Sequence, residues 1–252
     1  MEIKNLITTG FSAIDNVTGG FAPTELIVIA GRGRMGKTSF VLSIARNTAV
    51  DKKIPIAFFS LKMNMVKLVT LLISNVCEIN GEKILNGQLN HDEWDRLDKN
   101  INKFLDAPLY IDDTSRSSIE EIVEKIQQLV VEHSVKCVII DRLQLVECIV
   151  HNRDDELFVC LNILKRIAEE LNIVVIVTSM LGIGSEESTR HPRMSDHSEF
   201  KTIDNIADWS VFLWRSDLCQ VQSVAMKDET CSYGRFSIAR RGFLKIEDGI
   251  VS

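Results

Sequence analysis

Residues 26 to 38 read Leu-Ile-Val-Ile-Ala-Gly-Arg-Gly-Arg-Met-Gly-Lys-Thr, and no other stretch of the sequence carries as clear a signal of its fold. Its first five residues are continuously apolar, which is typical of a strand buried on both faces. The last eight fit the phosphate-binding loop pattern of a glycine, four free positions and Gly-Lys-Thr. An amphipathic stretch follows at residues 39–46. Strand, glycine loop and helix in this order predict a site for the phosphates of a nucleotide.

Each part of the loop suits that ligand. Glycines let backbone N–H groups turn inward and approach an anion closely. Lys37 reaches the outer phosphates as a point charge, and Thr38 places a hydroxyl on a magnesium ion. The helix that begins here directs the positive end of its dipole at the same anion.

The composition limits the class of protein. The chain has 252 residues, of which 45% are hydrophobic, and this suits one large α/β domain with a sizeable core. Its formal net charge is −6, so any contact with DNA needs a local basic patch or an assembled ring. We find no signal peptide and no apolar run that could cross a membrane, and we expect no membrane partner and a cytoplasmic location.

Six cysteines are scattered without a Cys-x-x-Cys pair: Cys77, Cys137, Cys148, Cys160, Cys219 and Cys231. A zinc or redox site is therefore not indicated. Several lie in apolar segments, where we expect reduced thiols that act as small core residues.

Apolar runs and helical stretches alternate along the chain. We expect strands at 25–30, 55–61, 108–112, 136–141, 173–179 and 209–214, and helices at 37–50, 64–78, 91–105, 117–133 and 153–171. This order predicts an α/β fold with a mostly parallel central sheet and helices on both faces. The polar region 182–205 predicts long loops, and short runs at 221–227, 233–239 and 243–247 predict C-terminal hairpin strands.

An apolar strand that ends in Asp141 provides a second phosphate-site element, because such an aspartate holds magnesium through water in phosphate-loop enzymes. Further segments follow in a fixed order between residues 9 and 215. They are Thr9-Gly10-Phe11-Ser12-Ala13-Ile14-Asp15, Thr18-Gly19-Gly20-Phe21, the phosphate loop, Phe59-Ser60-Leu61-Lys62-Met63, Tyr110-Ile111-Asp112-Asp113-Thr114, Asp141-Arg142-Leu143-Gln144-Leu145, Met194-Ser195-Asp196, Ala207-Asp208 and Phe212-Leu213-Trp214-Arg215. Together they resemble the RecA-like motor domain of the DnaB-type replicative helicases.

The resemblance implies a RecA-like P-loop NTPase that binds ATP and Mg²⁺ between the subunits of a homo-oligomeric ring. It implies single-stranded DNA, and possible replication proteins, as partners. Residues 1–252 would form one such domain, with a leader at 1–8 and without the family's N-terminal domain and linker helix. Thr38 and Asp141 would hold the metal. The implied nucleotide contacts are Gly31, Arg32, Gly33, Arg34, Met35, Gly36, Lys37, Thr38, Ser39 and Arg215; Arg215 is alternatively an ordinary arginine at a strand end.

The chain departs from the family at its hydrolytic centre. Lys62 stands where the family has the glutamate that polarises water, and Met180 stands where it has a glutamine that senses the γ-phosphate. A charged lysine cannot accept a proton, and a thioether cannot donate a hydrogen bond.

Two further family elements are altered. An arginine finger is either lost, with Lys227 followed by two acids, or supplied by Arg240 and Arg241. In the DNA loop, Ser198 and Lys201 replace the family's arginine and glycine.

These departures favour an ATP-binding, DnaB-like helicase domain associated with DNA replication whose hydrolysis is weak or lost. The alternative is an active motor with Glu186, Glu187 or Asp112 as a displaced base. A RecA-like ATPase of the recombinase or clock-protein type is a more distant possibility. Trp94, Trp209 and Trp214 are expected in the core or on a sheet face.

Overall fold

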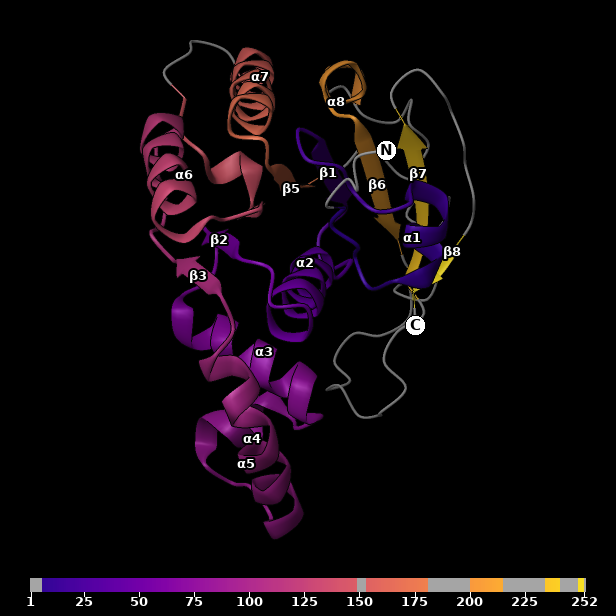
Figure 1. Cartoon of the computed structure of the whole chain (residues 1–252). Coiled ribbons are helices and arrows are strands. Elements are labelled where there is room, and N and C mark those ends of the chain that lie inside the picture. Colours follow the sequence, from indigo (N-terminus) through magenta and orange to yellow (C-terminus); the bar gives the residue numbers. More distant parts are fainter. Residues whose placement is uncertain (1–5, 149–152, 181–199, 215–233, 241–248, 252) are drawn as a thin grey trace.

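The computed structural model describes residues 6–148, 153–180, 200–214, 234–240 and 249–251. Their strands form one eight-stranded sheet in the order β3-β2-β4-β5-β1-β6-β7-β8 (Figure 1). The strands are β1 (Leu26–Gly31), β2 (Ile56–Ser60), β3 (Leu109–Asp112), β4 (Cys137–Asp141), β5 (Val174–Met180), β6 (Trp209–Trp214), β7 (Gly234–Arg240) and β8 (Gly249–Val251). The first six in sheet order are parallel and the last two are antiparallel, which confirms the expected architecture.

The helices and helical turns are α1 (Ser12–Thr18), α2 (Lys37–Ala45), the π-helical turn η1 (Arg46–Asp51), α3 (Met65–Cys77), α4 (Gly81–Asn86), α5 (His91–Leu105), α6 (Ile119–His133), the 3₁₀ turn η2 (Leu143–Leu145), α7 (Arg153–Leu171) and α8 (Phe200–Ile206). The starts of α5 and α6 are fixed by capping boxes, in which Asn90 pairs with Glu93 and Ser118 with Glu121. In Figure 1, α4 and α5 lie beyond α3, away from the sheet.

Two apolar cores lie on the two faces of the sheet. Side chains alternate along a strand, so Leu26 and Val28 of β1 pack in the core with α6, α7 and α8. Ile27 and Ile29 pack in the core with α1, α2 and α3. Every residue of β1 is buried, as its continuously apolar sequence predicts.

Some expected elements were wrong in detail. The α-helix expected at 37–50 ends at Ala45 and continues as η1. A helix, α8, replaces part of the loop expected at 182–205, because Ile203 and Ile206 are buried in the core beside α7. The short helices α1 and α4 were not predicted, and Trp94 is 52% exposed rather than buried.

At the C-terminal edge, β7 matches the run expected at 233–239, and β8 was not predicted. The runs expected at 221–227 and 243–247 lie outside the described residues.

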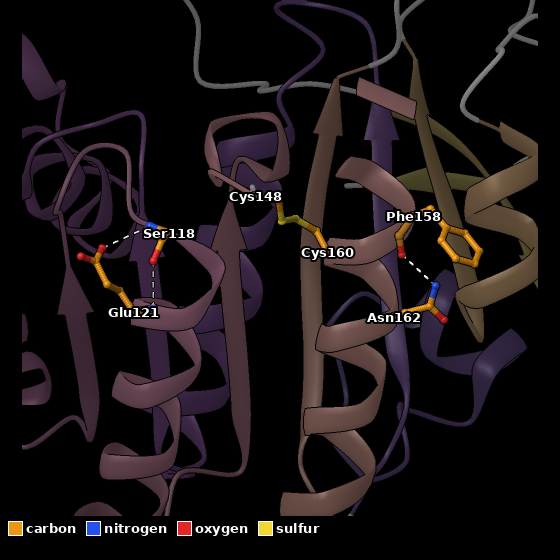
Figure 2. The surroundings of a disulfide bond; sticks show 6 residues. All are labelled: Ser118, Glu121, Cys148, Phe158, Cys160 and Asn162. Atoms are coloured by element: carbon orange, nitrogen blue, oxygen red, sulfur yellow. Dashed lines mark hydrogen bonds between the residues drawn. A yellow bond between two sulfur atoms is a disulfide. The ribbon is translucent and has the colours of Figure 1, made fainter. Parts of the chain in front are cut away.

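Two cysteines differ from expectation. Cys148 and Cys160 form a disulfide that joins the segment after η2 to α7, as Figure 2 shows. The expectation of reduced thiols was therefore wrong for this pair, because the fold brings two segments together that carry no paired-cysteine motif. Cys77 and Cys137 are buried and free, while Cys219 and Cys231 lie outside the described residues. Within the described ranges, no helix is long and apolar enough to cross a membrane.

Candidate functional site

The described residues of the predicted phosphate and metal site come together at one edge of the sheet. Gly31 ends β1 and is in register with Met180 at the end of β5, while Ser60 at the end of β2 is in register with Asp141 at the end of β4. Because these strands are neighbours and parallel, their carboxyl ends meet, which is where open α/β sheets bind ligands.

The loop between β1 and α2 has the backbone that an anion cradle requires. A Cβ on Gly31 would lie 2.8 Å from the carbonyl oxygen of Leu213, so only glycine allows β6 to pair this closely. Gly36 has a φ of 84°, in the left-handed region that favours glycine, and it turns the chain into α2. Gly36 has no side chain with which to cap α2, so the first N–H groups of the helix are left for another acceptor.

Lys37 is folded back onto its own loop. Its Nζ donates hydrogen bonds to the carbonyl oxygens of Gly31 at 2.6 Å and Arg32 at 2.7 Å. Burial, together with the charges of Arg142 and Lys62, lowers the pKa of Lys37 to about 8, although the charge of Asp141 opposes this shift. Burial and the two neighbouring cations both disfavour the charged form of this lysine, which a bound polyanion would favour.

Asp141 joins the loop to the centre of the sheet. Its Oδ2 accepts a hydrogen bond from Thr38 Oγ1 at 2.8 Å, and its Oδ1 accepts one from Thr178 Oγ1 at 2.5 Å. The peptide bond between Asp141 and Arg142 is cis. In the part of the chain that the structure describes, no three carboxylate, imidazole or thiol side chains gather into a metal site. The Thr38–Asp141 pair instead fits Mg²⁺, which keeps waters and takes phosphate oxygens.

The two altered positions flank this pair. Lys62 is exposed just after β2, and its charge acts on Lys37. Gln144 holds the backbone of Met180, because its Oε1 accepts from Met180 N at 3.0 Å and its Nε2 donates to Met180 O at 3.2 Å. Arg142 donates from Nη1 to the Sδ of Met180 at 3.0 Å. We did not predict roles for Arg142 and Gln144, and their sequence signal was their place in the segment 141–145, which resembles the family.

Several candidate residues lie at another part of the sheet or outside the described residues. Arg215, Lys227, Arg241 and the expected DNA loop lie outside the described residues. Arg240 pairs with Trp209 at the start of β6, the opposite end of the sheet from the loop. The backbones of Arg34, Met35 and Ser39 lie in the loop and the first turn of α2, and all three residues are at least partly exposed.

Two motif aspartates have structural roles. Asp15 accepts hydrogen bonds from the backbone N–H groups of Thr9 and Gly10, which folds the segment before α1. Asp208 accepts from Leu26 N at 2.8 Å and from Lys165 Nζ at 2.7 Å, and so fixes the start of β1 against α7.

A model of the DnaB-like helicase C terminal domain family matches residues 7–241. The chain belongs to this family. Among its DnaB-like relatives, the probable replicative DNA helicase of Trieres chinensis is 38% identical over 214 residues, which cover 83% of this chain and 47% of that protein. The replicative DNA helicase DnaC of Bacillus subtilis (strain 168) is 35% identical over 215 residues, which cover 84% of this chain and 47% of that protein. This DnaB-like chain thus spans about half the length of these relatives.

Solved structures share the fold. One solved ATPase domain matches with a TM-score of 0.86 and 26% identity, over 97% of this chain and 86% of that one. A DnaB-like replicative helicase, described with its interactions with primase, matches with a TM-score of 0.82 and 26% identity. The match covers 97% of this chain and 60% of that one. The sheet is therefore that of a RecA-like motor domain, as the sequence predicted.

Proposed function

We propose that this chain is a DnaB-like helicase domain of DNA replication that binds ATP and Mg²⁺ but hydrolyses ATP weakly or not at all. One observation carries the proposal. The phosphate loop and Asp141 lie together and are joined by the bond from Thr38, while Lys62 and Met180 follow or end the two neighbouring strands, where the family has its catalytic side chains.

The residues present fit the nucleotide. Lys37, the backbone of residues 31–36 and the start of α2 would hold the phosphates, and Thr38 with Asp141 would hold the ion. The ion neutralises charge on the phosphates when it is bound. Ser39 lies next to this loop, and Arg215 is proposed as a further nucleotide contact on family position alone.

The same geometry disfavours rapid hydrolysis. The charged side chain of Lys62 cannot orient water by accepting its proton, and the thioether of Met180 cannot donate to a phosphate. Losing one preorganised polar group of this type typically costs about 10²–10³ in kcat. Two such losses leave binding intact and turnover slow.

The competing function is an active motor, which family membership favours. An active motor needs another base for the attacking water, and Asp112 does not supply one. Asp112 ends β3, which three strands separate from β1 and its phosphate loop, and the Asp112 carboxylate is bound by Lys125 at 2.5 Å. Glu186 and Glu187 lie outside the described residues.

Family relationships support the remaining parts of the proposal. They are one RecA-like domain, a homo-oligomeric ring, contact with single-stranded DNA or another replication protein, and a cytoplasmic location. The net charge of −6 makes DNA the weakest of these for an isolated chain.

Equilibrium binding of ATP, measured by calorimetry with Mg²⁺, tests the central part. We expect the wild type to bind, and Lys37→Ala to lose at least about tenfold in affinity because a charge-assisted bond to phosphate is removed. Lys52→Ala changes an exposed lysine outside the site and is the matched control. Absence of binding by the wild type at millimolar ATP, or an unchanged Lys37→Ala affinity, would refute the proposal.

A further inference from the structure

Arg142 has poorly satisfied hydrogen-bonding groups at the centre of the site. It follows Asp141 directly at the end of β4, and its Nη1 donates to the Sδ of Met180, which is a weak acceptor. Its Nε is buried and has no hydrogen-bond partner among the described residues. A buried donor without a partner is unfavourable, so a better acceptor is expected in the functional state of the protein.

The electrostatic setting shows which kind of acceptor fits. Arg142 directly follows Asp141, whose Oδ2 accepts a hydrogen bond from Thr38, the residue directly after Lys37, so the two cations belong to the same edge of the sheet. Lys62 lies two residues after Ser60, which is in register with Asp141, and adds a third positive charge at the same edge. Asp141 opposes them, but both of its oxygens already accept hydrogen bonds from threonines. The cluster therefore favours an anion with several charges.

The position of Arg142 is also specific within the sheet. It contacts Met180, the residue at the family's position for sensing the γ-phosphate, and Met180 is in register with Gly31, the first residue of the phosphate loop. A guanidinium is planar, always charged and able to donate two parallel hydrogen bonds to phosphate oxygens, which a thioether cannot do. Moving from the Sδ of Met180 to a phosphate exchanges a weak acceptor for a strong one.

We propose that Arg142 is a specificity-determining residue of this site: its guanidinium contacts the terminal phosphate of ATP and makes the site prefer ATP over ADP. This inference rests on the proposed nucleotide binding. It adds a contact from within the same chain, which replaces the sensing group that is missing at position 180.

Calorimetric titrations with Mg²⁺-ADP and with the non-hydrolysable β,γ-imido analogue of ATP test it. We expect the wild type to bind the triphosphate more tightly than ADP. Arg142→Gln should weaken triphosphate binding about tenfold and leave ADP binding unchanged. Arg142→Lys keeps the positive charge but lacks the two parallel N–H donors of the guanidinium, so it should retain part of the preference for the triphosphate over ADP. Arg166→Gln, on the exposed face of α7 where Arg166 pairs with Glu170, is the matched control.

Thermal melting of the nucleotide-free proteins gives a second readout. Arg142→Gln removes an unpaired buried donor and a like charge beside Lys37, so its melting temperature should equal or exceed that of the wild type. If Arg142→Gln melts at a lower temperature, the nucleotide preference of Arg142→Lys is compared with that of the wild type instead.

The outcomes separate the two proposals. A full preference for triphosphate in Arg142→Gln overturns the inference, and so does a wild type that binds both nucleotides equally; nucleotide binding itself would stand in either case. A wild type that binds neither nucleotide overturns the inference together with the proposed function.

Discussion

Asp141 ties the phosphate loop to the centre of the sheet through a single side chain. It is 2% exposed and accepts hydrogen bonds from Thr38 on α2 and Thr178 on β5. A carboxylate offers both oxygens as acceptors and a full negative charge to a metal ion, whereas an amide offers one oxygen and no charge. The residue therefore aligns the phosphate loop, and in the proposed function it would also hold the metal ion.

We expect Asp141→Asn to lower the affinity for ATP about tenfold when Mg²⁺ is present and to change it little in EDTA. The comparison of both titrations by calorimetry isolates the metal. Equal losses with and without Mg²⁺ would mean that the residue only supports the loop.

The sequence predicted part of this residue-level picture. Lys37, Thr38 and Asp141 lie at one edge of the sheet, as expected, because a strand, a glycine loop and a strand-end acid have local signals; their roles stay predictions. Gln144 and Arg142 were not assigned, since their contacts with Met180 depend on how the segment after β4 lies against the end of β5. Local patterns carry no information about that placement.

At the scale of elements, the sheet edge at β3 is tied to α6 by an ion pair. Asp112 accepts a hydrogen bond from Lys125 Nζ at 2.5 Å and one from Thr114 N at 2.8 Å. Burial alone would raise the pKa of Asp112, but the bonds from Lys125 and Thr114 outweigh it and hold the pKa below its usual range. The carboxylate is thus a structural anion and a weak base.

A carboxyl group with a lowered pKa stabilises the fold above its unfolded pKa, and this contribution is lost as the pH falls through the folded pKa. We expect Asp112→Asn to lower the free energy of unfolding by about 1 kcal/mol at pH 7, because the pair is partly exposed. The difference from the wild type should disappear below the folded pKa. Urea unfolding at several pH values measures it, and a difference that grows on acidification would contradict the assignment.

Strongly patterned elements were the predictable ones. The apolar runs became β1 to β6, and the long amphipathic stretches became α3, α5, α6 and α7. Short helices such as α4 and α8 were missed, because they depend on packing against neighbours rather than on their own propensity. The disulfide between Cys148 and Cys160 was missed for a similar reason, since two segments meet only in the fold.

At the scale of the whole molecule, the parallel sheet brings four strand ends to one edge, and each of them leads to a different part of the candidate site. The ends of β1 and β4 supply the phosphate loop and Asp141, while those of β2 and β5 lead to Lys62 and Met180. Under the proposed function, binding and hydrolysis depend on different strands of the same sheet, so that one could be lost while the other is kept.

Steady-state ATP hydrolysis by the wild type and the Lys62→Glu/Met180→Gln double variant, with and without single-stranded DNA, tests this account most directly. We predict a wild type that binds ATP with turnover near background, and a double variant at least about 100-fold faster, because an acceptor for water and a donor to phosphate are restored. A wild type that hydrolyses ATP, is stimulated by single-stranded DNA and is slowed by the double substitution would contradict the account.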